Sequence, residues 1–162
     1  MDTGSELNYA VLSSTESIRL FYSYSHKDQN LRDDLAKHLS VLKRQRVIAE
    51  WHDRRIDAGY EWKRELAKNM PQARVILLLV SASFLASDYC WDKEIKKAVK
   101  RHDQGKAKVI PVILRKCDWQ GAPFSKLQGL PSNQKAITSW RNRDEAFTDV
   151  ALGIRQAIRH LR

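Results

Sequence analysis

Two apolar stretches decide the fold of this chain, VILLLV at residues 75–80 and VIPVIL at residues 109–114. Each is a nearly continuous apolar run, which is typical of a strand buried on both faces of a parallel sheet that helices cover. Strands are therefore predicted at 74–80 and 108–114, in the centre of the sheet. Three further stretches rich in β-branched, aromatic and aliphatic residues predict strands at 18–24, 47–51 and 136–140.

Apolar residues at helical spacing fill most of the segments between these strands and the end of the chain. The stripes consist of Leu31, Leu35, Leu39 and Leu42; Trp62, Leu66 and Met70; Ile95, Ala98 and Val99; and Phe147, Val150, Ala151, Ile154, Ile158 and Leu161. The stretch 116–133 carries glycines and prolines and predicts a loop. Alternating strands and helices predict an α/β fold, a flavodoxin-like sheet of five parallel strands in the order 2-1-3-4-5 with helices on both faces.

Composition sets the class of protein and its expected location. The chain has 162 residues and a net charge of +10, from 29 Lys and Arg against 19 Asp and Glu. Its length and apolar clusters predict one domain at 18–162 after a flexible polar leader at 1–17, and no apolar run approaches the roughly 20 residues of a membrane span. Cys90 and Cys117 lack a CxxC pattern and the histidines lack metal-site spacing, so the sequence predicts a cytoplasmic domain without a metal.

The predicted winding places a ligand site beyond the carboxyl ends of the first and third strands, at loops 23–28 and 81–92. The chain has neither GxGxxG nor GxxxxGK[ST], no GxSxG, and no carboxylate at the end of the third strand. These absences argue against hydride transfer with a dinucleotide, NTP hydrolysis, triad hydrolysis and a phosphoacceptor role.

What remains at these loops is a group of hydroxyls with Glu94 nearby in sequence. The hydroxyls are those of Ser23, Tyr24, Ser25, Ser81, Ser83 and Ser87. A carboxylate beside hydroxyls suits a ribose ring, because it can stabilise an oxocarbenium-like transition state by charge. One carboxylate suffices if the leaving group is nicotinamide, which is cationic while attached. The alternative for Glu94 is a solvated position on a helix surface.

Four segments in order resemble the bacterial type of TIR (Toll/interleukin-1 receptor) domain. They are IRLFYSYSHKD at 18–28, WHDRRIDAGYEW at 51–62, VILLLVSASFLASDYCWDKEI at 75–95 and VIPVILRKCDW at 109–119. The resemblance implies a flavodoxin-like domain whose enzymatic members cleave NAD+ at the nicotinamide–ribose bond. The products would be nicotinamide and ADP-ribose or a cyclic isomer, with NAD+ as the substrate and no cofactor.

The resemblance also implies roles for individual residues. Glu94 matches the catalytic glutamate, and residues 53–59 match the BB loop, which gates the site and mediates assembly in the family. The implied substrate contacts are Ser23, Tyr24, Ser25, Arg54, Arg55, Asp57, Trp62, Ser83 and Trp91, and the implied assembly residues are Asp53, Ile56, Ala58 and Gly59. Core packing is the alternative for the two tryptophans, and solvation is the alternative for the two arginines.

The sequence departs from the family pattern around the glutamate. Many members have Ser-x-Trp-Cys-x-x-Glu, whereas Glu94 follows Cys90 at one residue more, so that Lys93 falls at the cysteine-aligned position. On a continuous helix such a shift rotates a side chain by about 100°. We favour Glu94, since an irregular helix start would restore its direction and a lysine cannot stabilise a cation. In the BB loop, Ala58 and Gly59 stand where Pro-Gly is usual.

The predicted function is therefore an NAD+ glycohydrolase or cyclase that self-association activates, and the resemblance implies a role in bacterial immunity against phage with a sensor or effector partner. One alternative is a non-catalytic TIR–TIR interaction or adaptor module. A nucleoside deoxyribosyltransferase is a further enzymatic alternative. Basic charge alone gives non-specific affinity for nucleic acid, so nucleic acid is not predicted as a partner.

Overall fold

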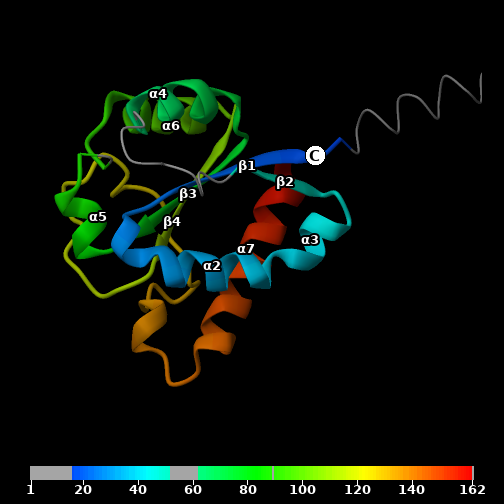
Figure 1. Cartoon of the computed structure of the whole chain (residues 1–162), viewed down its shortest axis with the longest axis vertical. Helices are drawn as coiled ribbons and strands as arrows, with labels where there is room; N and C mark the ends of the chain where they lie inside the picture. The colour runs from blue at the N-terminus through cyan, green and yellow to red at the C-terminus, as the bar shows by residue number, and fades with distance from the viewer. Residues whose placement is uncertain (1–15, 52–61, 89, 162) are drawn as a thin grey trace, which may run out of the picture.

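The computed structural model describes residues 16–51, 62–88 and 90–161. In this part of the chain, parallel strands form a four-stranded sheet in the order β2-β1-β3-β4 (Figure 1). The strands are β1 (Ile18–Ser23), β2 (Ile48–Trp51), β3 (Val75–Val80) and β4 (Lys108–Ile113). The predicted α/β class and the 2-1-3-4 order are confirmed, and β3 lies inside the sheet as predicted. The central position predicted for 108–114 is wrong, because β4 is at the edge of the four described strands.

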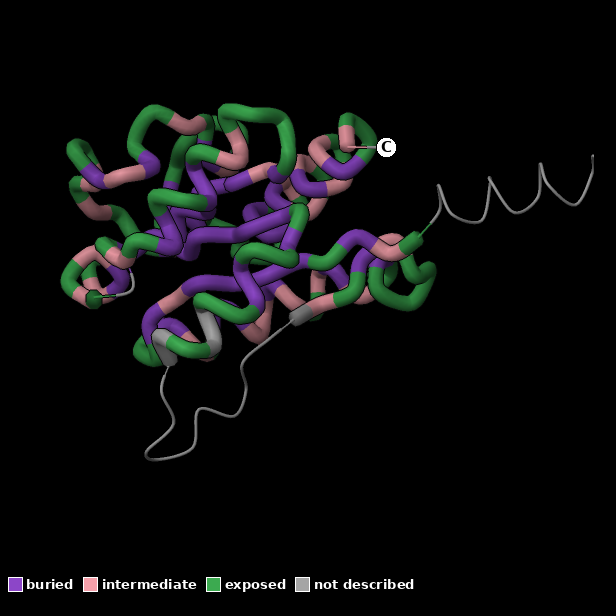
Figure 2. The backbone as a smooth tube through the Cα atoms, turned by 90° about the horizontal axis from the view of Figure 1, so that it is seen from above, coloured by how far each residue is buried: buried purple, intermediate pink, exposed green. Residues whose placement is uncertain are grey.

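Helices cover both faces of the sheet, and each face has its own apolar core (Figures 1 and 2). One face carries α2 (Gln29–His38), α3 (Ser40–Arg44) and α7 (Arg143–Leu161); the other carries α4 (Trp62–Asn69), α5 (Ala82–Ala86) and α6 (Lys93–Asp103). Short 3-10 helices are η1 (His26–Asp28), η2 (Met70–Gln72) and η3 (Ile137–Ser139).

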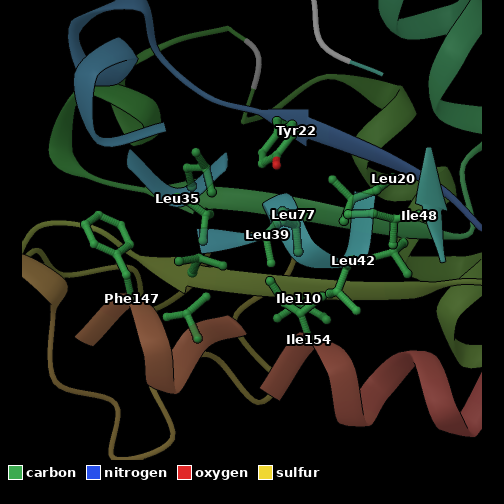
Figure 3. Close-up of a cluster of buried hydrophobic side chains, with 14 of the residues drawn as sticks. Leu20, Tyr22, Leu35, Leu39, Leu42, Ile48, Leu77, Ile110, Phe147 and Ile154 are labelled. Atoms are coloured by element: carbon green, nitrogen blue, oxygen red, sulfur yellow. The ribbon is translucent and has the colours of Figure 1, made fainter. Parts of the chain in front are cut away.

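Strand β3 explains why the sheet has two cores. Successive side chains point to opposite faces, so Leu77 joins the core under α2, α3 and α7 while Ile76 and Leu78 join the core under α6. All six residues of β3 are fully buried. Figure 3 shows Leu77 in the first of these cores, together with Leu39 and Ile110. The unbroken apolar run of β3 therefore reflects burial on both faces of the sheet, as the sequence predicted.

The predicted fifth strand at 136–140 is wrong, because η3 occupies this position. Among the described residues, the segment that precedes η3 pairs with β4 at an isolated bridge between Val112 and Leu130. Leu130 N–H donates to Pro111 O at 2.8 Å and Ile113 N–H donates to Leu130 O at 2.8 Å. Pro111 has no N–H with which to extend this ladder, and proline is confined to such edges for that reason.

Two helical details also differ from the predictions. The stripe from Leu31 to Leu42 belongs to two helices, since α2 ends at His38 and α3 begins at Ser40. Helix α5 lies inside the predicted loop 81–92, and the Ser81 side chain caps it by accepting from Phe84 N–H at 3.1 Å. Residues 1–15 of the predicted leader lie outside the described part. No helix that the structure describes is long and apolar enough to span a membrane.

Candidate functional site

The loops that follow β1, β3 and β4 are joined through the buried carboxylate of Asp28. Ser81 Oγ donates to Asp28 Oδ2 at 2.5 Å, and Arg115 Nε donates to Asp28 Oδ1 at 3.0 Å. The Asp28 side chain is 1% exposed. Because both oxygens have partners from other loops, Asp28 holds the carboxyl ends of three strands together. Sequence reasoning selected neither Asp28 nor Arg115 as a functional residue.

Glu94 lies in the first turn of α6, where the chain fixes its backbone. Asp92 is the N-cap, and its Oδ1 accepts from Glu94 N–H at 2.9 Å. Such a cap satisfies one of the unpaired N–H groups at a helix start. Glu94 is 5% exposed, which is unusual for a glutamate. The fold therefore holds Glu94 in a buried position, and the alternative of a solvated position on the helix surface is wrong.

A cleft of about 820 Å³ lies between α4 and the approach to α6. Arg64 and Ala67 of α4 line one side, and the other lining residues are Asp88, Trp91, Asp92, Lys93 and Glu94. Its size falls within the usual range for small-molecule sites. The cleft brings three acidic residues, two cationic residues and an aromatic ring together.

Trp91 is half exposed beside this cleft, and its orientation is fixed by a hydrogen bond. The indole Nε1–H donates to Leu85 O at the end of α5, at 2.9 Å. Ser87 Oγ donates to Phe84 O at 2.6 Å in the same turn. The indole is therefore anchored at its nitrogen while 52% of the residue stays accessible to a ligand.

The longer spacing between Cys90 and Glu94 has a structural explanation. Cys90 and Trp91 lie in a turn, and the helix begins only at Lys93. The 100° rotation expected on a continuous helix does not apply, because Cys90 precedes the helix. Cys90 is fully buried, Lys93 is exposed and Glu94 is buried. Burial raises the pKa of the Cys90 thiol to about 11, so this thiol stays protonated and is not a nucleophile at neutral pH.

The hydroxyl residues predicted to bind substrate have local partners. Ser25 caps η1 by accepting from Lys27 N–H at 3.3 Å, and Tyr24 OH donates to Gln29 Oε1 at 2.8 Å. Ser23 is buried and its hydroxyl has no hydrogen-bond partner among the described residues. Ser83 is half-buried in α5. Within the described part of the chain, none of these four residues lines the cleft beside Glu94.

Several predicted residues cannot be placed in the site. Trp62 begins α4, and its side chain lies outside the described part. The other predictions outside the described residues are Asp53, Arg54, Arg55, Ile56, Asp57, Ala58 and Gly59. Of the predicted site residues, the structure brings Trp91 and Glu94 together at one cleft.

A second group that sequence reasoning missed lies under the end of β1. Arg32 is fully buried, and its Cζ lies 4.5 Å from the ring centre of Tyr22 and 5.9 Å from that of Tyr24. Tyr22 OH donates to Glu50 Oε1 at 2.8 Å. Burial, and then the Glu50 charge, raises the pKa of Tyr22 well above its usual value. The cation–π contacts of Arg32 with both tyrosine rings therefore help to hold the loop after β1 at Tyr24.

The fold and the cleft define an α/β domain with a candidate ligand site beyond the carboxyl ends of parallel strands. The sequence matches the family model of the TIR domain over residues 20–151. The chain belongs to the TIR domain family, and the resemblance seen in its sequence is confirmed.

An uncharacterized protein, y4lF, of Sinorhizobium fredii (strain NBRC 101917 / NGR234) is 54% identical over 138 residues, which cover 85% of this chain and 43% of that protein. The chain thus spans less than half the length of this relative.

One solved structure supports the fold. The TIR domain of the Toll-related receptor TRR-2 from Hydra magnipapillata superposes with a TM-score of 0.58 at 16% identity, covering 86% of this chain and 97% of that one. A weaker likeness, with a TM-score of 0.45 and 20% identity, is to the TIR domains of the activated Roq1 resistosome that recognises the effector XopQ, covering 90% of this chain and 83% of that one.

Proposed function

We propose that this TIR domain cleaves the nicotinamide–ribose bond of NAD+. The observation that carries the proposal is the Glu94 carboxylate, buried in the first turn of α6 and lining the cleft beside the accessible Trp91 ring. A buried carboxylate at a cleft is uncommon unless the fold or a ligand uses it. Its chemistry suits a substrate that develops positive charge.

The proposed step breaks the bond between C1′ of the ribose and the pyridinium nitrogen. Nicotinamide leaves with the bonding electron pair and becomes neutral, so no general acid is required. The positive charge moves to the ribose ring, where the Glu94 carboxylate stabilises it. Water then adds to C1′ and releases a proton to give ADP-ribose, or a nucleophilic atom of the same substrate closes a cyclic isomer.

The other predicted residues have supporting roles in this proposal. The Trp91 ring offers a stacking surface for nicotinamide or adenine. Arg54 and Arg55 would bind the pyrophosphate, and Asp53, Ile56, Ala58 and Gly59 would complete the cleft of a second copy during self-association. Further substrate contacts would come from Ser23, Tyr24, Ser25, Asp57, Trp62 and Ser83.

The cellular setting is part of the same proposal. We place the domain in the cytoplasm, in bacterial immune signalling against phage, where NAD+ loss or a nucleotide product would be the output. A sensor or effector would control it, either as a separate protein or as a further domain. The length of the Sinorhizobium relative, of which this chain covers 43%, is compatible with a further domain.

The test is nicotinamide release from NAD+, with chromatography of the second product, at protein concentrations where the chain self-associates. Wild type should release nicotinamide, and Glu94→Gln should not, because the amide keeps the shape of the side chain without its charge. Glu145→Gln at the exposed start of α7 is the matched control and should behave as wild type. If folded, self-associated wild type leaves NAD+ intact, the non-catalytic interaction module replaces this proposal.

A further inference from the structure

The Glu94 carboxylate already has a cationic partner in the structure. Lys97, one helical turn further along α6, places its Nζ 3.3 Å from Glu94 Oε1. The Glu94 side chain is 6% exposed and the Lys97 side chain is 64% exposed. The ammonium group therefore reaches from solvent to an almost buried carboxylate at the edge of the cleft.

Other lysines of α6 do not share this arrangement. Lys93, Lys96 and Lys100 are exposed on the same helix, and Lys97 is the described residue whose ammonium forms an ion pair with Glu94. The second acidic group at this helix start, Asp92, is engaged with the Glu94 N–H. The contact with Lys97 is thus specific to one position of the lysine-rich face.

Helix stabilisation explains only part of this contact. A glutamate followed by a lysine at i,i+3 stabilises a helix slightly. At Glu94, however, the same ammonium neutralises the charge that the proposed reaction uses. A substrate whose nicotinamide–ribose end is cationic would have to take the place of Lys97 next to the carboxylate.

We propose that Lys97 is a competing cation that restrains the candidate site, and that the cationic end of the substrate must displace its ammonium from Glu94. This inference rests on the proposed function. Displacement is mechanically easy, since Lys97 is mostly exposed and its flexible chain can turn the ammonium into water. The arrangement favours ligands that bring their own positive charge and disfavours neutral ones, because a neutral ligand leaves the ion pair in place.

The first experiment compares Lys97→Met with Lys96→Met. Both variants remove one lysine charge from the exposed side of α6, but only Lys97→Met removes the partner of Glu94. At equal ionic strength and equal self-association, Lys97→Met should raise kcat/KM for NAD+ about two- to fivefold above Lys96→Met, which corresponds to about 0.4–1 kcal/mol. An equal or lower kcat/KM would overturn the inference. Thermal unfolding of both variants checks that neither has lost its fold.

A binding measurement tests the inference without turnover. 1-Methylnicotinamide, a pyridinium ion methylated on the ring nitrogen, is the cationic probe, and nicotinamide is its neutral counterpart. NMR titration gives a Kd for each. Lys97→Met should bind the cation about two- to fivefold more tightly than Lys96→Met, while the Kd of nicotinamide stays unchanged. Equal cation affinity in the two variants would overturn the inference. If no variant releases nicotinamide from NAD+, the proposed function fails, and this titration alone decides the role of Lys97.

Discussion

The loop junction around Asp28 and the first turn of α6 around Glu94 each contain a buried carboxylate, but their surroundings differ. Both oxygens of Asp28 have partners from other loops, Ser81 and Arg115. Glu94 has a partner from its own helix, Lys97, and it lines a cleft. Both oxygens of Asp28 are engaged in contacts that hold the fold together. Glu94, in contrast, is held in place at a cleft that a ligand can reach.

The role of a buried acid depends on where in the chain its partners lie. A carboxylate whose partners come from distant parts of the chain contributes mainly to stability, because its removal leaves those partners unpaired. A carboxylate with one exposed, flexible partner contributes little to stability, and its charge becomes available when that partner turns into solvent. We therefore expect the two positions to respond differently to substitution.

The largest expected effect on stability is at Asp28. Asp28→Ala should lower the free energy of unfolding by about 1–3 kcal/mol, mainly because the buried hydroxyl of Ser81 loses its acceptor, while the half-exposed Arg115 side chain can turn its guanidinium to water. Glu94→Gln should change it by no more than about 0.5 kcal/mol. Urea unfolding of both variants measures the contrast, with Asp34→Asn as the control, because the Asp34 side chain on α2 is 44% exposed. Similar losses at Asp28 and Glu94 would remove the distinction between the two regions.

Substitution of Trp91 sharpens the description of the cleft. Trp91→Ala removes both the ring and its hydrogen bond to Leu85, and it should raise KM for NAD+ about tenfold, the equivalent of about 1.4 kcal/mol. Trp91→Phe keeps an aromatic ring and should raise KM about threefold. Steady-state kinetics separates the two. An unchanged KM in Trp91→Ala would show that the ring does not contact the substrate.

The smallest expected effect is at the far end of α6 from Glu94. His102 Nδ1 accepts from Val109 N–H at 3.0 Å, and burial, followed by the charge of Lys108, lowers the pKa of His102 below 6.5. The neutral ring is favoured in the folded state, so its contribution to stability is complete above pH 6.5 and is lost as the pH falls toward the lowered pKa.

Urea unfolding at pH 7.5 and pH 5.5 measures this contribution. His102→Asn keeps a side-chain acceptor but does not titrate, so the variant should lose less stability than wild type over this interval. Equal losses would mean that other groups cause the acid sensitivity. Turnover that depends on Glu94 is measured separately from this stability effect, because His102 lies at the opposite end of α6 from Glu94.

The sequence predicted β3 and β4 as strands because burial on both faces leaves a continuous apolar run, but it did not show that β4 lies at the edge of the described sheet. It failed at 136–140, where β-forming residues are present but the facing edge of β4 contains Pro111. The pattern within a segment does not show which edge the segment will meet. The even spacing of leucines likewise hid the break between α2 and α3 at Leu39.

The candidate site divides in the same way. Glu94 and Trp91 belong to one short segment, so a sequence pattern could select both. The pairing of Asp28 with Arg115 joins residues 87 positions apart, and it exists only because parallel strands bring their carboxyl ends together. Lys97 was hidden for a different reason, since a lysine-rich helix face is usually solvated and only the burial of Glu94 distinguishes this one.

The most direct test of Glu94 as the catalytic carboxylate is the initial rate of nicotinamide release from NAD+ by wild type and by Glu94→Gln. Both proteins are compared at equal self-association, after unfolding curves have shown that both are folded. Glu94→Gln should release nicotinamide at least about a hundredfold more slowly than wild type, with unchanged stability. The loss of one electrostatic group at a reacting centre typically lowers the rate by at least about this factor. A Glu94→Gln variant that releases nicotinamide within about threefold of an active wild type would contradict the assignment of Glu94 as the catalytic carboxylate.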